Sequence, residues 1–96
     1  MLILVTYDVD TTGPEGQRRL RHVAKECMNY GLRVQNSVFE CVVDFAQFTQ
    51  LKMKLKDIIS EDFDSIRFYH LGKNYEAKVE TLGVNKGINL QGELIL

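Results

Sequence analysis

Hydrophobic and polar positions in the first third of the chain predict one strand and one helix. Residues 2–7 form a run of β-forming side chains, and consecutive apolar positions indicate a central strand covered on both faces. An apolar stripe with spacings of three and four follows, made of Leu20, Val23, Ala24, Cys27 and Met28. This stripe predicts a helix, which we expect Thr12 to cap and Gly31 to end in a left-handed conformation.

The pattern continues with further strands around a second helix. Residues 32–43 have strand character throughout, and Asn36-Ser37 in their middle predicts a tight turn between two short strands. A second helical stripe is formed by Phe48, Leu51, Leu55, Ile58 and Ile59. Asp44 and Gln47 precede it with the spacing of a capping box. Residues 65–71 predict another strand, and weaker strand patterns occupy 77–82 and 91–96.

This order of elements predicts the fold. Strand, helix, strand, strand, helix and strand, with one or two further strands, is the ferredoxin-like split pattern of an α+β domain. It places both helices on one face of an antiparallel sheet. The 96 residues suit a single domain. The apolar ending at 93–96 predicts that the terminus adds to a sheet edge, either in its own chain or in another subunit.

Composition excludes several classes of protein. With 45% hydrophobic and 26% charged residues and one proline, a packed core is expected rather than disorder. The formal charge of −1 excludes a general polycation but leaves room for a local basic face. Cys27 and Cys41 lie in apolar segments without metal-ligand spacing, so we expect reduced thiols and a cytoplasmic location. The longest apolar stretch is too short for a bilayer, so no membrane association is expected.

Asp8 is the first candidate for chemistry. A carboxylate at the end of a buried central strand costs desolvation energy unless it is compensated, and a hard divalent cation such as Mg²⁺ would do so. Asp10 lies two positions further, so an extended backbone would place it on the same side. The alternative is that Asp8 or Asp10 caps the following turn or helix, and local sequence alone favours this role.

Basic side chains are concentrated in the first predicted helix, off its apolar stripe. They are Arg18, Arg19, Arg21, His22 and Lys25. With the nearby Arg33, this set suits contacts to phosphate, because guanidinium groups bind phosphate oxygens in pairs. An ordinary solvated helix face is the alternative. The lysines of the second helix, Lys52, Lys54 and Lys56, are interpreted as solubilising.

Three segments taken together resemble a known family. They are residues 5–9 (Val-Thr-Tyr-Asp-Val), residues 31–40 (Gly-Leu-Arg-Val-Gln-Asn-Ser-Val-Phe-Glu) and residues 67–72 (Arg-Phe-Tyr-His-Leu-Gly). In this order they resemble CRISPR-associated protein two, the small subunit of the CRISPR adaptation machinery. The apolar ending at 94–96 is similar to that of the subtype that accompanies type I-C systems.

The resemblance implies a ferredoxin-like homodimer in which roughly residues 77–96 cross to the partner. It implies that Asp8 is the catalytic residue and binds Mg²⁺, with two copies of Asp8 facing each other across the two-fold axis. It further implies a metal-dependent endonuclease on single-stranded RNA or double-stranded DNA, which acts with the CRISPR integrase (CRISPR-associated protein one) in spacer acquisition. The residues that match or fall near nucleic-acid contacts of the family are Tyr7, Arg18, Arg19, Arg33 and Phe39.

Two other functions remain open from the sequence. One is a non-catalytic adaptor that holds duplex DNA on its basic helix and bridges integrase dimers, in which Asp8 is dispensable. The other is a toxin-like nuclease that cleaves messenger RNA on the same fold. The first would show normal spacer acquisition in cells that carry Asp8→Ala, and the second would arrest growth when expressed alone.

Overall fold

The computed structural model describes residues 1–72 and 78–84, and these contain five strands and two helices. In chain order the elements are β1 (Leu2–Asp8), α1 (Pro14–Met28), β2 (Gly31–Gln35), β3 (Val38–Val42), α2 (Phe45–Ile58), β4 (Ser65–Leu71) and β5 (Lys78–Gly83). The turn predicted at Asn36-Ser37 separates β2 from β3. The strand predicted at 77–82 is confirmed as β5, whereas the one predicted at 91–96 lies outside the described residues.

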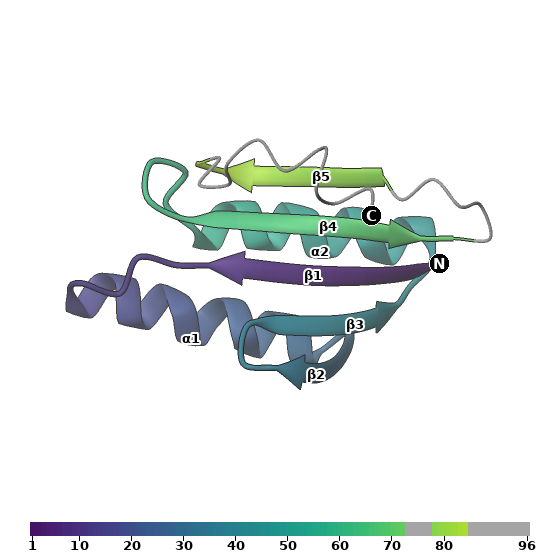
Figure 1. Cartoon of the computed structure of the whole chain (residues 1–96), viewed down its shortest axis with the longest axis horizontal. Helices are drawn as coiled ribbons and strands as arrows, with labels where there is room; N and C mark the ends of the chain where they lie inside the picture. The colour runs from purple at the N-terminus through teal and green to yellow at the C-terminus, as the bar shows by residue number, and fades with distance from the viewer. Residues whose placement is uncertain (73–77, 85–96) are drawn as a thin grey trace, which may run out of the picture.

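The strands form one antiparallel sheet in the order β2-β3-β1-β4-β5. Both helices lie on the same side of this sheet, behind it in Figure 1. This is the predicted ferredoxin-like α+β fold, with β1 as the central strand and β5 added beside β4. Neither helix of the described residues is long and apolar enough to cross a membrane.

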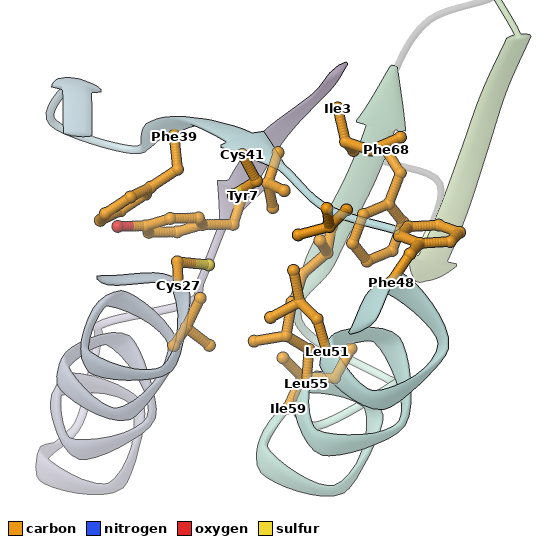
Figure 2. Close-up of a cluster of buried hydrophobic side chains, with 14 of the residues drawn as sticks. Ile3, Tyr7, Cys27, Phe39, Cys41, Phe48, Leu51, Leu55, Ile59 and Phe68 are labelled. Carbon is orange, nitrogen blue, oxygen red and sulfur yellow. The ribbon is translucent and has the colours of Figure 1, made fainter. Parts of the chain in front are cut away.

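The core fills the space between the sheet and the two helices. Alternate side chains of β1, namely Ile3, Val5 and Tyr7, are buried beneath the helices. Figure 2 shows two groups of side chains in this layer. Tyr7, Phe39 and Cys27 lie on the α1 side, and Leu51, Leu55, Phe48 and Phe68 lie on the α2 side. Met28, predicted to belong to the apolar stripe of α1, is instead exposed at the end of the helix.

The opposite face of the sheet carries no helix, which corrects the expectation that β1 is covered on both faces. The strand registers place Leu2 beside Val42 and Leu71 on this face, and Leu32 of β2 lies opposite Glu40. Leu32 is 75% exposed and Val42 is 76% exposed. We call the set Leu2, Leu32, Val42 and Leu71 the open-face cluster. A single chain leaves this apolar surface in water.

The helix boundaries agree only in part with the predictions. Asp44 forms the predicted capping box, because its side chain accepts from the Gln47 N–H and the Gln47 side chain accepts from the Asp44 N–H. The N-cap of α1 is Gly13 rather than Thr12, and it makes no side-chain hydrogen bond. Pro14 at the first position has the backbone angle that a helix requires, so the helix begins there without a polar cap.

Gly31 does not end α1, which is capped by Asn29 in a right-handed conformation. Gly31 instead begins β2, and among the described glycines only Gly83 has a positive φ. A Cβ atom at Gly31 would lie 2.1 Å from the Glu40 carbonyl oxygen and 2.7 Å from Cys41 Sγ. The glycine is therefore required by the close approach of β2 to β3, not by a left-handed turn.

Candidate metal and nucleic-acid site

Asp8 is the last residue of β1 and lies in register with Ser65 of β4. Its side chain is exposed, and strand alternation places it on the same face as Leu2, Leu4 and Thr6, which is the face without helices. The expected position at the end of the central strand is therefore confirmed, although the carboxylate is not buried within one chain. Asp8 lies at the rim of this sheet face, at the opposite end of β1 from Leu2.

Asp10 adopts the turn-capping role that the sequence left open. Its Oδ1 atom accepts hydrogen bonds from the Thr12 N–H at 3.0 Å and from the Thr12 hydroxyl at 2.8 Å. These bonds form a local turn between β1 and α1 and occupy one oxygen of the carboxylate. Asp10 therefore helps to shape the loop that follows Asp8.

The oxygen donors at the end of β1 fit Mg²⁺ in kind, because this ion prefers hard oxygen ligands and takes only one or two carboxylates from a protein. The residues that the structure describes contain no group of three His, Cys, Asp or Glu side chains that could hold a metal ion. Asp8 is the candidate carboxylate ligand of this set, and Asp10 lies two positions further with its Oδ1 atom engaged by Thr12.

Asp64, which the sequence did not single out, lies directly before β4 and is completely buried. Its two oxygens accept four hydrogen bonds from three separate parts of the chain. Arg19 donates from Nε at 2.7 Å and from Nη2 at 3.4 Å, while the backbone N–H groups of Asp10 and Ser60 donate at 3.0 Å and 2.9 Å. No local periodicity marks this position, since Arg19 and Asp10 are distant from it in sequence.

The electrostatics of Asp64 follow from these contacts. Burial raises the pKa of its carboxyl, but the hydrogen bonds from Arg19, Ser60 and Asp10 outweigh burial and hold the pKa below its ordinary value. The hydrogen bond to Asp64 likewise raises the pKa of Arg19. The Arg19 guanidinium is therefore paired with Asp64 inside the fold. Its predicted contact with nucleic acid stays a prediction.

The structure brings together three other predicted contact residues. The rings of Tyr7 and Phe39 stack with centroids 6.2 Å apart, and the Arg33 guanidinium lies 5.2 Å from the Phe39 centroid. Tyr7 and Phe39 are buried, while Arg33 is exposed. Burial raises the pKa of Tyr7, an effect that Arg33 partly offsets, and the Tyr7 hydroxyl donates to the Asn36 carbonyl at 3.2 Å. In this arrangement the buried rings of Tyr7 and Phe39 pack beneath the Arg33 guanidinium and do not offer an exposed face on which a nucleic-acid base could stack.

Arg18 differs from its neighbour Arg19, because its side chain is exposed on the outer face of α1. Arg21, His22 and Lys25 are exposed on the same helix. Positions 18, 21, 22 and 25 recur at helical spacing, so they share one face. We call these four residues the basic face of α1. It is separate from the Tyr7, Phe39 and Arg33 group.

The lysines of α2 do more than the predicted solubilising role. Lys52 Nζ lies 2.9 Å from Glu80 Oε1 and 4.9 Å from the centroid of the Phe48 ring. The other oxygen of Glu80 contacts His70 Nε2. Lys54 lies near Glu26 at 3.7 Å. Lys52 thus connects α2 to β5, and His70 connects β4 to the same glutamate. No local pattern in α2 indicated these contacts.

Comparisons with known proteins identify the family of this chain. The family model described as CRISPR associated protein Cas2 matches residues 1–79. The chain is 56% identical to the "CRISPR-associated endonuclease Cas2" of Halalkalibacterium halodurans over 95 residues, which cover 99% of each chain. It is 54% identical to the "CRISPR-associated endoribonuclease Cas2" of Chlorobaculum tepidum over 96 residues, with full coverage of both.

Solved structures give the same result. The crystal structure of Streptococcus pyogenes Cas2 at pH 6.5 is similar with a TM-score of 0.72 and 63% identity, covering 78% of this chain and 90% of that one. A hypothetical protein, TT1823 from Thermus thermophilus, has a TM-score of 0.66 and 31% identity, covering 86% and 90% of the two chains. From its sequence and its fold, this chain belongs to the CRISPR-associated protein Cas2 family.

Proposed function

We propose that this protein is a Mg²⁺-dependent endonuclease that works as a homodimer in CRISPR spacer acquisition, together with the CRISPR integrase. The observation that carries the proposal is the position of Asp8 at the rim of the helix-free sheet face, which also carries the open-face cluster. Relatives at 56% and 54% identity are named an endonuclease and an endoribonuclease, which supports phosphodiester hydrolysis and leaves both DNA and RNA as substrates.

The helix-free face supports the proposed second copy. Apolar side chains on one face of a sheet are stabilised when a second sheet packs on them, and exposed apolar patches of this kind mark interaction surfaces. In a two-fold dimer the same surface is used by both copies. The open-face cluster would be buried in such a pair, and Asp8 on the same face would approach its counterpart at the rim of the interface.

The chemistry follows from two carboxylates brought together. Two copies of Asp8 at short distance would repel each other, and a shared divalent cation would remove that repulsion. Mg²⁺ held there would supply a water of lowered pKa and polarise the scissile phosphate. Arg18 on the exposed helix face and Arg33 beside Phe39 would bind the phosphate backbone and neutralise its charge.

Cleavage assays with Asp8→Asn and Asp8→Ala test the proposal. Purified variants are incubated with single-stranded RNA and with double-stranded DNA, with Mg²⁺ or with EDTA. We expect the wild-type protein to cleave only with Mg²⁺, and both variants to fall to the rate that wild type shows in EDTA. Asp57→Asn, an exposed carboxylate on α2, serves as the matched control and should cleave at the wild-type rate.

Full Mg²⁺-dependent cleavage by both purified Asp8 variants would remove the proposed catalytic role. The second candidate function, a non-catalytic DNA adaptor, would then stand, and the observation in its favour is the basic face of α1. Spacer acquisition in cells separates the two functions, because an adaptor retains normal acquisition with Asp8→Ala whereas the nuclease does not.

DNA binding by the basic face is measured directly. The double variant Arg18→Ala and Arg21→Ala should bind duplex DNA less tightly. The slope of log K against log salt should become shallower by about 0.9 for each phosphate that the variant no longer neutralises. An unchanged slope would mean that this face does not bind the phosphate backbone.

A further inference from the structure

We propose that Asp64 is a positioning residue for the Asp8 site, because its buried carboxylate fixes the backbone that follows β1. The inference rests on the proposed function of Asp8 and names a residue that serves the same site without touching substrate. Its basis is the set of hydrogen bonds that join Asp64 to Asp10, two residues beyond Asp8.

The first step of the argument is the cost of placing a carboxylate in the interior. Asp64 is 0% exposed, and an apolar side chain would fill the same space without a desolvation penalty. Four hydrogen bonds compensate this carboxylate within the fold. Its donors come from the β1–α1 loop, from α1 and from the α2–β4 loop, so the group holds three segments in one arrangement.

The second step is that Asp10 is held from both sides. Its N–H donates to Asp64 Oδ1 at 3.0 Å. Its carbonyl oxygen lies against Gly16 in the first turn of α1, where a Cβ atom would come within 1.8 Å of it. Val9 alone separates this anchor from Asp8 in the chain, so few backbone rotations lie between them. This anchor therefore constrains the backbone on one side of Asp8, and the pairing of Asp8 with Ser65 in the β1–β4 ladder constrains it within the strand.

The third step concerns Arg19, the other half of the buried pair. Its Nε and Nη2 atoms contact different oxygens of Asp64, which fixes the plane of the carboxylate. With that plane fixed, Oδ1 faces the Asp10 N–H and Oδ2 faces the Ser60 N–H. Residues that orient a metal ligand without touching the metal typically weaken metal binding when they are removed. Asp64 would act on Asp8 in this way, through the backbone of Asp10.

Asp64→Asn tests the inference, since asparagine keeps the shape and removes the charge. The neutral amide weakens the hydrogen bonds from both the Asp10 N–H and the Ser60 N–H, and its NH₂ group leaves one of these two donors without an acceptor. Amide hydrogen exchange measured by NMR should be at least about tenfold faster at Asp10, while the amide of Val5 in the centre of β1 keeps its relative protection. This measurement requires neither metal nor substrate.

A Mg²⁺ titration followed on the amide signal of Asp8 gives the second measurement. The half-saturating Mg²⁺ concentration should rise by about tenfold or more in Asp64→Asn. Ile3→Val, a core truncation at the other end of β1, is the control for a general loss of stability and should leave that concentration unchanged. A purely structural role of Asp64 would lower the folded fraction without moving the metal midpoint.

Arg19→Gln keeps the test decisive if Asp64→Asn does not fold. It removes the guanidinium pair and leaves the backbone donors to Asp64 in place, so both effects should appear in the same direction and be smaller. Wild-type exchange at Asp10 together with a wild-type Mg²⁺ midpoint in the folded variants would overturn the inference. The proposed function would be overturned instead if wild type showed no Mg²⁺-dependent cleavage, or if cleavage survived Asp8→Asn. In either case the exchange rate at Asp10 would still report on the role of Asp64.

Discussion

Cys27 and Cys41 show at the scale of single residues how burial controls reactivity. Both side chains are free thiols at 0% exposure beneath the sheet. Burial raises the pKa of Cys27 to about 12 and that of Cys41 to about 11. The thiolate is the reactive form of cysteine, so neither side chain is a nucleophile at neutral pH. The apolar sequence around both residues predicts the same absence of reactivity.

A thiol-specific colorimetric reagent tests this conclusion. At pH 8 the native protein should release no colour over the time in which a small free thiol reacts completely. In denaturant both cysteines should react, which gives two equivalents per chain and serves as the internal control. Rapid labelling of the native protein would show that the core opens around Cys27 or Cys41.

The candidate carboxylates show what sequence reasoning finds at a single position and what it misses. Asp8 was identifiable because it ends a recognisable strand and precedes a turn. Asp64 was not, because its significance comes from Arg19 and Asp10, which lie 45 and 54 positions away in the chain. Arg18 and Arg19 are adjacent in sequence, but in the fold Arg19 is paired with Asp64 whereas Arg18 is exposed. The sequence alone does not distinguish them.

At the scale of elements, the start of α2 is a local structure that the sequence specified. Asp44 and Gln47 exchange two hydrogen bonds across one helical turn, with distances of 2.9 Å and 2.7 Å. The partners are three residues apart, so their contact needs nothing from the rest of the chain. The cap of α1 was assigned wrongly because Pro14 lets that helix begin without a polar side chain.

Asp44→Ala should therefore destabilise the protein by about 1 kcal/mol, the usual cost of losing an N-cap. Urea unfolding followed by circular dichroism measures the change, with the slope against urea expected to stay constant. Asp57→Ala, which removes an exposed carboxylate near the other end of α2, is the control and should not lower stability. Equal losses in the two variants would argue against a specific role for the capping box.

The contact of Lys52 and His70 with Glu80 fastens β5 to α2 and β4, and it makes the stability of this region dependent on pH. Burial raises the pKa of Glu80, but hydrogen bonds from Lys52 and His70 outweigh burial, so the net pKa lies below its ordinary value. A carboxyl group with a lowered pKa in the folded state stabilises the fold above its unfolded pKa of about 4.3. The contribution disappears as pH falls through the folded value.

Comparison of wild type with Glu80→Gln between pH 7 and pH 3 checks this sign. Wild type should be more stable than the variant by up to about 1 kcal/mol at pH 7, because the pair is partly exposed and screened by solvent. The difference should shrink as the pH falls through the lowered pKa of Glu80 in the folded protein. A difference that stays constant across this range would show that altered packing, rather than charge, explains the variant.

At the scale of the whole molecule, the distribution of apolar side chains between the two sheet faces is the dominant feature. Helices cover one face, and the other carries the open-face cluster in water. The run of apolar residues 2–7 had suggested a strand covered on both faces. In one chain this is wrong, and the proposed dimer would restore it by covering the second face with another copy.

Val42→Lys should weaken that dimer. A two-fold interface contains each substitution twice, and burying two unpaired lysines opposes association. Sedimentation velocity should show a dissociation constant raised by at least about tenfold, which corresponds to about 1.4 kcal/mol. Met53→Lys, which changes an exposed apolar residue on α2, is the matched control and should leave association unchanged. A stable dimer in Val42→Lys would place the interface elsewhere.

The sequence alone determined the order of the strands and helices, the turn between β2 and β3, the capping box of α2 and the identity of Asp8 as a strand-terminal carboxylate. These features depend on the periodicity of side chains or on partners within a few residues. Only the tertiary structure decided which sheet face is covered, why Gly31 must be a glycine, and that Arg19 is paired with a buried carboxylate. Those features arise from contacts between segments that are far apart in the chain. The free energy of such a contact depends on how deeply its atoms are buried and how close they come, and no local sequence pattern encodes either quantity.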